Sequence, residues 1–276
     1  DKVRIWAKAE WEQPGGSVKA RAAHAIISKA IRSGKLHSRN SLLDASSGNT
    51  AIAYATLLKP LGWKPTICLP SNASAERKNI LKSLGAEFIL TSPLEGTDGA
   101  QIVAKETYAA NPDKYFYADQ YSNDANWQAH YLTTAEEIWT QTKGKITHFV
   151  AGLGTTGTFV GTARRLKELG NVQLISLQPD HPFHPLEGWK HLATAHRPGI
   201  YDDTLADKTL VIDSSGVFDM IKSISIHERL FISPSGAANL LGALEVASQI
   251  KEGDIVTTLA DTLDRYQEVR KEIFGT

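Results

Sequence analysis

Residues 146–158 read Ile146-Thr147-His148-Phe149-Val150-Ala151-Gly152-Leu153-Gly154-Thr155-Thr156-Gly157-Thr158. The apolar run Ile146–Ala151 predicts a buried strand, and Thr158–Leu169, which Gly170 stops, predicts an amphipathic helix. The turn between them is rich in glycine and in hydroxyl groups. In parallel α/β folds, ligands bind beside such turns, where a strand ends and a helix begins. This stretch therefore predicts both the fold class and a ligand site.

The same alternation of short apolar runs and longer amphipathic segments continues in both directions. It predicts an α/β fold with largely parallel sheets. Gln178–Asp207 is too long for an ordinary connection, and it is a candidate functional loop. The other predicted strands are Val3–Ala9, Ser41–Ala45, Pro65–Leu69, Glu87–Thr91, Tyr115–Tyr117, Val172–Leu177, Leu230–Ile232 and Asp254–Leu259, and the other predicted helices are Val18–Ser33, Thr50–Leu58, Ala75–Leu84, Gly99–Ala110, Ala129–Thr142 and Ala237–Ile250.

The composition excludes several classes of function. The 276 residues include 30 Lys and Arg and 30 Asp and Glu, so the formal net charge is zero and a nucleic-acid or membrane-surface binder is disfavoured. The single cysteine, Cys68, lies in an apolar run and is predicted to be a buried, inert thiol, which fits a reducing, cytoplasmic location. No apolar stretch approaches the ~20 residues that cross a bilayer. No signal peptide is visible, although the chain begins at Asp1 and an upstream targeting segment is left open.

The turn after Ile146–Ala151 contains the pattern G-x-G-x-x-G, which by itself is a weak indication of a dinucleotide site. Its threonines are unusual beside a pyrophosphate, whereas they suit a terminal phosphate monoester that accepts several hydrogen bonds at a helix N-terminus. An anion site is therefore favoured over a plain turn. Its candidate residues are Gly154, Thr155, Thr156, Gly157 and Thr158.

Three other turns before predicted helices carry chemistry. Lys19 follows two glycines and falls in the first turn of its helix, where a cation is disfavoured, so it is either a surface lysine or an amine nucleophile. The run 46–50 either cradles a carboxylate or caps a helix. Ser235 occupies an N-cap position or points its hydroxyl at a ligand heteroatom. An amine, a carboxylate cradle, a phosphate site and a lone serine together suggest pyridoxal 5′-phosphate, held as a Schiff base.

The order and spacing of these four segments resemble the cysteine synthase family of β-replacing, fold-type II pyridoxal-phosphate enzymes. The resemblance extends from Ile5 to Tyr266, and residues 146–158 look like the branch that uses O-phosphoserine. It implies the tryptophan synthase β-like architecture, with two three-layer domains whose sheets are parallel or mixed. A smaller, mobile domain would cover residues 13–122, and residues 1–12 plus 123–276 would form the larger domain that binds the phosphate. The cofactor would lie in the cleft between them.

The resemblance also implies a role for each motif residue. Lys19 would form the Schiff base and later remove the α-proton, and the segment Gly154–Thr158 would hold the cofactor phosphate. Asn49 would bond the ring hydroxyl, and Ser235 would face the pyridine nitrogen. The substrate carboxylate would be bound by Ser46, Ser47, Gly48, Thr50 and Gln120.

The implied reaction converts an activated serine into an α-aminoacrylate, to which a sulfur nucleophile adds to give L-cysteine. A homodimer and a possible regulatory or sulfur-carrier protein partner are implied by the family alone. Lys190 falls near the place where the O-phosphoserine branch has an arginine, and it is the candidate ligand of the substrate phosphate, with help from Arg197. A solvated loop lysine is the alternative. The segment Glu187–Pro198 replaces a glycine-rich loop, and Asp119 stands where a glutamine is frequent, so the substrate is less defined than the cofactor.

Other functions stay open. A metal site is a weak alternative, because the clustered loop histidines lie between prolines. A dehydrogenase would leave Lys19 and Ser235 without a role. Serine dehydratase, cystathionine β-synthase and diaminopropionate synthase share the cofactor machinery, and a non-catalytic binding protein on the same fold is disfavoured by Lys19. The histidines are His181, His184, His191 and His196.

Overall fold

The computed structural model of the chain describes residues 2–46 and 48–275. It divides into two compact units, Gln13–Asn126 and Asp1–Glu12 together with Trp127–Thr276. Each unit contains one sheet, and every pairing between the strands of these sheets is parallel. The α/β class predicted from the sequence is confirmed.

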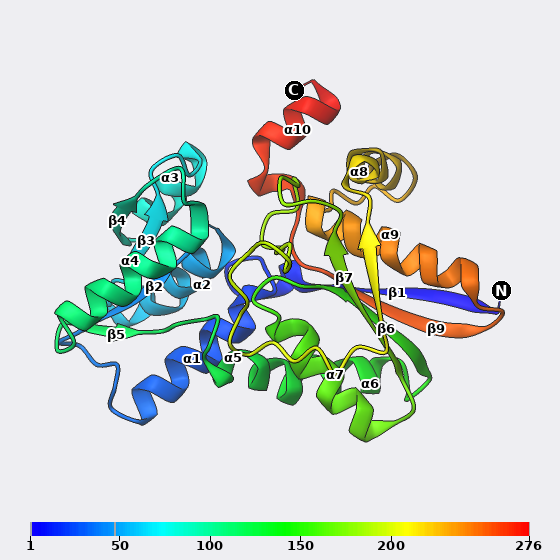
Figure 1. The fold of residues 1–276 in the computed structure, drawn as a ribbon, viewed down its shortest axis with the longest axis horizontal. Coiled ribbons are helices and arrows are strands. Elements are labelled where there is room, and N and C mark those ends of the chain that lie inside the picture. Colours follow the sequence, from blue (N-terminus) through cyan, green and yellow to red (C-terminus); the bar gives the residue numbers. More distant parts are fainter. Residues whose placement is uncertain (1, 47, 276) are drawn as a thin grey trace. The chain divides into compact units, whose positions relative to one another are not determined.

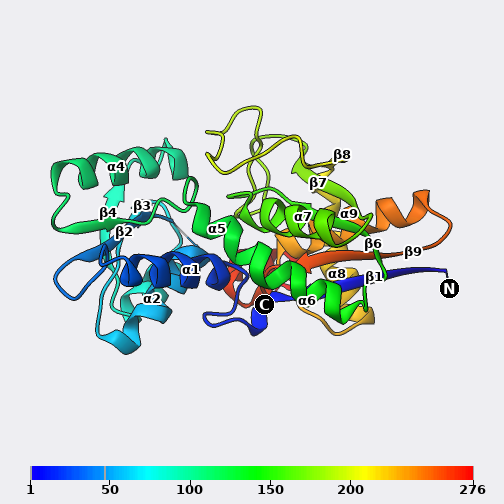
Figure 2. The same ribbon diagram turned by 90° about the horizontal axis from the view of Figure 1, so that it is seen from below.

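The unit Gln13–Asn126 is a three-layer arrangement around a four-stranded sheet of order β4-β3-β2-β5. Figure 2 shows α4 on one face of this sheet and α1 and α2 on the other. Alanine, isoleucine and leucine side chains of α1, α2 and the central strands fill the space between them. The strands are β2 (Ser41–Ala45), β3 (Thr66–Pro70), β4 (Glu87–Thr91) and β5 (Tyr115–Tyr117), and the helices are α1 (Lys19–Arg32), α2 (Asn49–Leu58), the 3-10 turn Lys59–Leu61, α3 (Ala75–Ser83) and α4 (Gly96–Ala110).

The other unit is built on a five-stranded sheet of order β1-β9-β6-β7-β8. In Figure 1, α8 and α9 lie on one face of this sheet, and α6 and α7 lie on the other. Two apolar clusters, one on each face, form its core. The strands are β1 (Val3–Ala9), β6 (Ile146–Gly152), β7 (Gln173–Pro179), β8 (Lys208–Ile212) and β9 (Gly253–Leu259). The helices are α5 (Asp124–Ala129), whose first residues belong to the unit Gln13–Asn126, α6 (Ala135–Gln141), α7 (Gly157–Leu169), α8 (Val217–His227), α9 (Pro234–Gln249) and α10 (Gln267–Phe274). The π turn His130–Thr134 lies between α5 and α6, and 3-10 turns lie at Glu10–Glu12, Ser214–Gly216 and Leu263–Arg265.

Most predicted elements lie within a few residues of their observed bounds, but some predictions are wrong. Leu230–Ile232 is not a strand: Ile232 makes one antiparallel bridge to Thr262, and Ser233 and Pro234 begin a helix directly afterwards. The helix predicted to start at Ala129 starts at Asp124, where the Asn123 side chain accepts a hydrogen bond from the Ala125 N–H.

Strand β8 and helices α8 and α10 were not predicted from the sequence. Strand β8 lies at the edge of its sheet, and alternate residues such as Val211 are exposed, so its apolar signal is short. Helix α10 has only 8 residues and buries none of them, so its apolar signal is also short.

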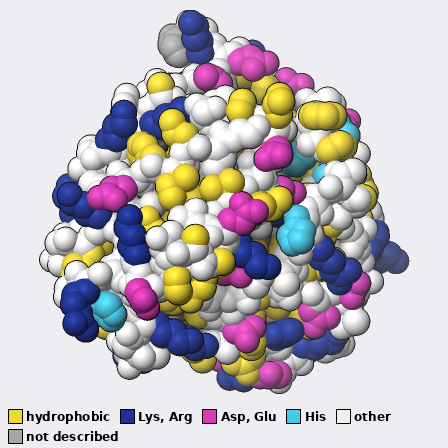
Figure 3. Space-filling view, turned by 60° about the vertical axis from the view of Figure 1, so that its left-hand side comes forward, with side chains coloured by type: hydrophobic (Ala, Val, Ile, Leu, Met, Phe, Trp, Pro, Cys, Tyr) yellow, Lys and Arg dark blue, Asp and Glu magenta, His cyan; other side chains and the backbone are white. Residues whose placement is uncertain are grey.

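The surface matches the balanced composition. Basic and acidic side chains are interspersed over the face in Figure 3. Within residues 2–46 and 48–275, no helix has the length and apolar character needed to span a membrane. The predicted burial of Cys68 is confirmed, and this burial raises the pKa of the thiol to about 12, which fits an inert thiol.

Candidate active site

Lys19 is the first residue of α1, as the sequence predicts. The turn before it is tight, because the Gly16 N–H donates to the Gln13 carbonyl oxygen at 2.7 Å and both Gly15 and Gly16 have positive φ. Val18, the N-cap residue, gives no side-chain cap. The amine of Lys19 therefore extends from a helix N-terminus, where a positive charge is disfavoured.

The segment Ser46–Thr50 follows β2 and opens α2. The Ser46 hydroxyl accepts hydrogen bonds from the backbone N–H groups of Gly48 and Ala51, at 3.3 and 3.2 Å. Asn49 is the first residue of α2, and Gly48 precedes it with a φ of −140° and a ψ of −135°. Ser47 lies outside the described residues. The hydroxyl of Ser46 thus helps to cap the helix, and the N-terminus of α2 remains the anion-binding end of this segment.

Thr50 and Gln120, which the sequence assigns to the same carboxylate, lie in contact. The Thr50 hydroxyl donates to Gln120 Oε1 at 2.8 Å, and Gln120 Nε2 donates to the Ala45 carbonyl oxygen at 2.9 Å. Both side chains are buried. The two residues are 70 positions apart in the chain. They meet because β2 and β5 are parallel neighbours whose carboxyl ends share one edge of the sheet.

The glycine–threonine turn between β6 and α7 is strained and closely packed. Thr156 has a φ of +72°, which is unfavourable for a β-branched residue, and α7 begins at the next residue. Among the described residues, the buried Thr156 hydroxyl has no hydrogen-bond partner. A buried hydroxyl without a partner at a helix N-terminus fits an anionic ligand.

A second segment covers this turn. A Cβ atom added at Gly154 would lie 1.9 Å from the Gly188 carbonyl oxygen, so only glycine fits there. The Lys190 N–H donates to the Leu153 carbonyl oxygen at 2.8 Å, and the Lys190 side chain is buried. The structure therefore places the backbone of Lys190 directly against the glycine–threonine turn.

His130 is a site residue that the sequence analysis missed. Its Nε2 lies 3.3 Å from the Thr158 hydroxyl, and its Nδ1 lies 2.9 Å from the Thr134 hydroxyl. The ring is buried and belongs to the π turn that interrupts the helix between α5 and α6. The only sequence signal is the His130 to Thr134 spacing, which does not indicate a contact with Thr158.

The expected position of Ser235 in its helix is wrong. Ser233 is the N-cap of α9 and accepts a hydrogen bond from the Gly236 N–H at 3.3 Å, while Pro234 occupies the first helical position. Ser235 is therefore inside the first turn, and its hydroxyl lies 3.2 Å from that of Ser233. Its hydroxyl is not needed for capping.

The structure shows no metal cluster at the loop histidines among the described residues, and His191 and Arg197 contact other residues of the same loop. Within the described residues, no group of three or more His, Cys, Asp or Glu side chains is arranged to hold a metal ion. His191 Nδ1 lies 2.9 Å from the Thr194 hydroxyl, and the exposed Arg197 pairs with Asp203.

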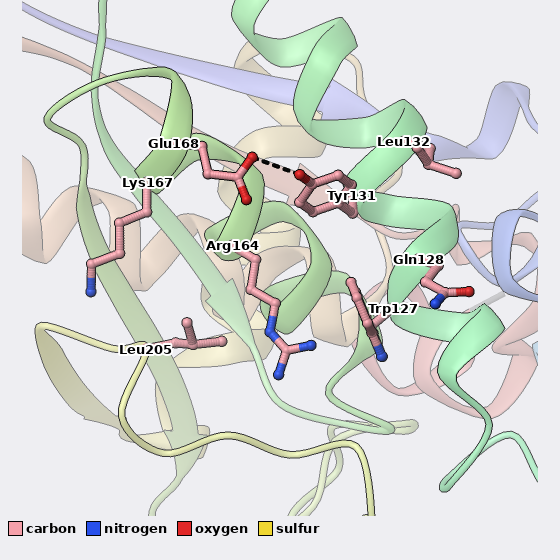
Figure 4. A pocket seen from close by; sticks show the side chains of 8 residues that line it. All are labelled: Trp127, Gln128, Tyr131, Leu132, Arg164, Lys167, Glu168 and Leu205. Carbon is pink, nitrogen blue, oxygen red and sulfur yellow. Dashed lines mark hydrogen bonds between the residues drawn. The ribbon is translucent and has the colours of Figure 1, made fainter.

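A separate pocket of about 620 Å³ opens between the π-turn segment and α7 (Figure 4). Arg164 stacks over the Trp127 ring, and the Tyr131 hydroxyl donates to Glu168 at 2.6 Å. None of the residues that the sequence assigns to the site lines it. The lining residues are Trp127, Gln128, Tyr131, Leu132, Arg164, Lys167, Glu168 and Leu205.

The geometry thus defines two sets of groups. The unit Gln13–Asn126 contains Lys19 at the start of α1 and the buried, hydrogen-bonded pair Thr50 and Gln120. In the other unit, a strained turn presents a buried hydroxyl and the N-terminus of a helix. A primary amine and a phosphate cradle are what a phosphorylated aldehyde cofactor requires. The residues present therefore fit pyridoxal phosphate.

Comparison with known proteins agrees with this chemistry. Residues 1–261 match the family described as pyridoxal-phosphate dependent enzyme, and the chain belongs to that family. It is 43% identical over 269 residues to a cysteine synthase of Aquifex aeolicus. The matched region covers 96% of this chain and 82% of the relative.

Solved structures show the same likeness. A cysteine synthase of Entamoeba histolytica superposes with a TM-score of 0.92 and 30% identity, covering 100% of this chain and 83% of that one. An O-acetylserine-dependent cystathionine β-synthase of Helicobacter pylori superposes with a TM-score of 0.90 and 31% identity, covering 97% of this chain and 89% of that one. The predicted family and cofactor are confirmed, and the fold is that of these enzymes.

Proposed function

We propose that this protein is a cysteine synthase, which replaces the β-substituent of an activated L-serine with sulfide to give L-cysteine. The likeness to the cysteine synthases of Aquifex aeolicus and Entamoeba histolytica supports the reaction. The observation that carries the proposal is the buried, unpartnered Thr156 hydroxyl at the start of α7, because it fits a phosphate group. Lys19 supplies the amine that such a cofactor needs.

Pyridoxal phosphate, when bound, withdraws electrons from the α-carbon of the amino acid joined to it. In our proposal Lys19 holds the cofactor before the substrate arrives, and its Nζ then accepts the α-proton. The residues Gly154, Thr155, Thr156, Gly157 and Thr158 bind the phosphate, and His130 orients the Thr158 hydroxyl. Asn49 bonds the ring hydroxyl, and the neutral Ser235 faces the ring nitrogen.

The substrate α-carboxylate is assigned to the segment after β2. Thr50 offers a backbone N–H group at the start of α2, Gly48 precedes that helix, and Gln120 Nε2 has a second hydrogen beside the one it donates to Ala45. The Ser46 hydroxyl holds the backbone of this segment, and Ser47 is assigned to the carboxylate from the sequence alone. Together these residues would orient the substrate so that its α-proton faces the base.

Replacing Thr156 with valine tests the phosphate assignment. Valine keeps the branching and removes the hydroxyl, so the cofactor-free protein should be as stable as the wild type or more stable. Its affinity for pyridoxal phosphate should fall ~10–100-fold, the equivalent of one hydrogen bond to a charged group. Thermal melting and a fluorescence titration with the cofactor measure the two effects. Unchanged affinity together with lower stability would show that Thr156 serves the fold alone.

We further propose that Lys190 binds the leaving group when that group is a phosphate. The bond from the Lys190 N–H to the Leu153 carbonyl oxygen, next to the glycine–threonine turn, supports this assignment. Lys190→Ala should raise the KM for O-phosphoserine ~10-fold or more, and Lys190→Arg should preserve it. The KM for O-acetylserine should change little in both variants. Equal changes for the two substrates in steady-state assays would remove this role.

The product decides between cysteine synthesis and the related reactions. The protein, loaded with pyridoxal phosphate, is incubated with sulfide and either O-acetylserine or O-phosphoserine, and the amino acids are quantified. We expect L-cysteine from at least one substrate. Pyruvate and ammonia alone would indicate an eliminating enzyme. Cystathionine formed with homocysteine, without cysteine from sulfide, would favour the activity named for the Helicobacter pylori enzyme.

A further inference from the structure

Asp44 is a buried carboxylate for which the proposed reaction has no use. It lies in the central strand β2, two residues before Ser46, and its exposed fraction is 1%. Its Oδ2 accepts hydrogen bonds from the Tyr54 hydroxyl at 2.9 Å and from the Gln120 N–H at 3.3 Å. Its Oδ1 accepts from the Ala45 N–H at 2.9 Å. One side chain thus binds the backbone of the last residue of β2 and of a residue shortly after β5.

These bonds connect Asp44 to both parts of the proposed carboxylate site. Ala45 leads into Ser46–Thr50, and Gln120 follows β5. The Gln120 side chain then bonds to Thr50 and to the Ala45 carbonyl oxygen, which closes the network. The Asn126 amide adds a bond to the Gln120 carbonyl oxygen at 2.7 Å. The position of Gln120 is therefore set from three sides.

A carboxylate at position 44 does not give the fold its lowest free energy. Burial raises the pKa of Asp44 to about 7, and the nearby Asp119 acts in the same direction, whereas the bonds from Tyr54 and the two backbone N–H groups lower it. All three hydrogen-bond donors are neutral. A buried carboxylate held by neutral donors costs folding free energy relative to an apolar group. The network is better suited to fixing geometry than to adding stability.

We propose that Asp44 is a positioning residue for the substrate α-carboxylate, because it holds the backbone of Ala45 and Gln120 and thereby aims the Gln120 amide and the start of α2. This inference rests on the proposed function of those groups. Asparagine at position 44 would turn an NH₂ group toward one of the two backbone N–H donors. That donor would lose its acceptor and move away, and the carboxylate site would be displaced.

The test compares two ligands that differ by the carboxylate. The holoprotein is titrated with L-serine and with 2-aminoethanol, and the visible absorbance of the bound cofactor reports binding. In Asp44→Asn we expect the Kd for L-serine to rise ~10-fold or more, while the Kd for 2-aminoethanol stays within about twofold. Asp113→Asn, the same change at an exposed position of the same unit, should alter neither. In the cofactor-free variant, hydrogen exchange of the Ala45 and Gln120 amides should be faster.

A double-substitution cycle shows whether Asp44 acts through Gln120. In a Gln120→Ala background, Asp44→Asn should cost less L-serine affinity than in the wild-type background, because only the path through Ala45 and the start of α2 remains. Equal weakening of both ligands in the single variant, or full additivity in the cycle, would overturn the proposal, as would unchanged binding of both ligands.

A graded variant keeps the test decisive should Asp44→Asn not fold. Tyr54→Phe removes one donor to the carboxylate and keeps both backbone bonds, so a smaller loss of about twofold to fivefold is expected, for L-serine alone. No selective loss there would also overturn the proposal. A wild-type holoprotein that binds the cofactor but does not respond to L-serine would overturn the proposed function first, and this inference with it.

Discussion

Lys19→Ala is expected to reduce cysteine formation by at least ~10³-fold, because the variant lacks both the amine that holds the cofactor and the base for the α-proton. The loss should not come from unfolding. A cation in the first turn of a helix is unfavourable, so its removal should leave stability unchanged or raise it by up to ~1 kcal/mol. The neighbouring residues Val18 and Ala20 are buried and keep the start of α1 in place.

Lys29→Ala is the matched control for this prediction. Lys29 is an exposed residue in the last turn of the same helix, where a cation is favourable. This variant should keep full activity, and its free energy of unfolding should fall by ~0.3–1 kcal/mol. Activity in Lys19→Ala within tenfold of the wild type, with the control unchanged, would show that another residue is the base.

Gly154→Ala is expected to have the second largest effect. The added methyl group would lie 1.9 Å from the Gly188 carbonyl oxygen, a backbone atom that cannot rotate away. Either the glycine–threonine turn or the segment that covers it must move, at a cost of ~1–3 kcal/mol. Because Thr155–Thr158 would move with the turn, the affinity for pyridoxal phosphate should fall ~100-fold. Cofactor titration and thermal melting measure both effects.

The control for this second prediction is Gly216→Ala. The same methyl group at Gly216 would meet no atom within 4 Å, and the φ of −80° suits alanine. Its stability and cofactor affinity should match those of the wild type. If Gly154→Ala bound the cofactor as tightly as this control, the turn would not be the phosphate site.

Much of the fold could be predicted from the sequence, since strands such as β2, β4 and β5 are short apolar runs between clear turn signals. Elements at the edges of the units were harder. Strand β8 and helix α10 are short and bury few or none of their residues, so each gives only a short apolar signal. The π turn at His130 depends on packing against α7, which local sequence does not encode.

The candidate site also contains features that the sequence predicts and features that it does not. Lys19 and the glycine–threonine turn could be predicted because each lies at a local junction before a helix. The cover that Gly188 places over Gly154, and the bonds from Asp44 to Gln120, join residues far apart in the chain. Ser233 rather than Ser235 caps α9, because the proline between them takes the first helical position. Contacts of this kind require the structure.

The most direct test of the central claim asks which residue joins the cofactor. The wild-type protein is loaded with pyridoxal phosphate, treated with borohydride to reduce the bond between cofactor and amine, digested and examined by mass spectrometry. We expect the phosphopyridoxyl group on the peptide that contains Lys19, and its absence from that peptide in Lys19→Ala. A label on another lysine, or a wild-type protein that takes up no label, would contradict the account.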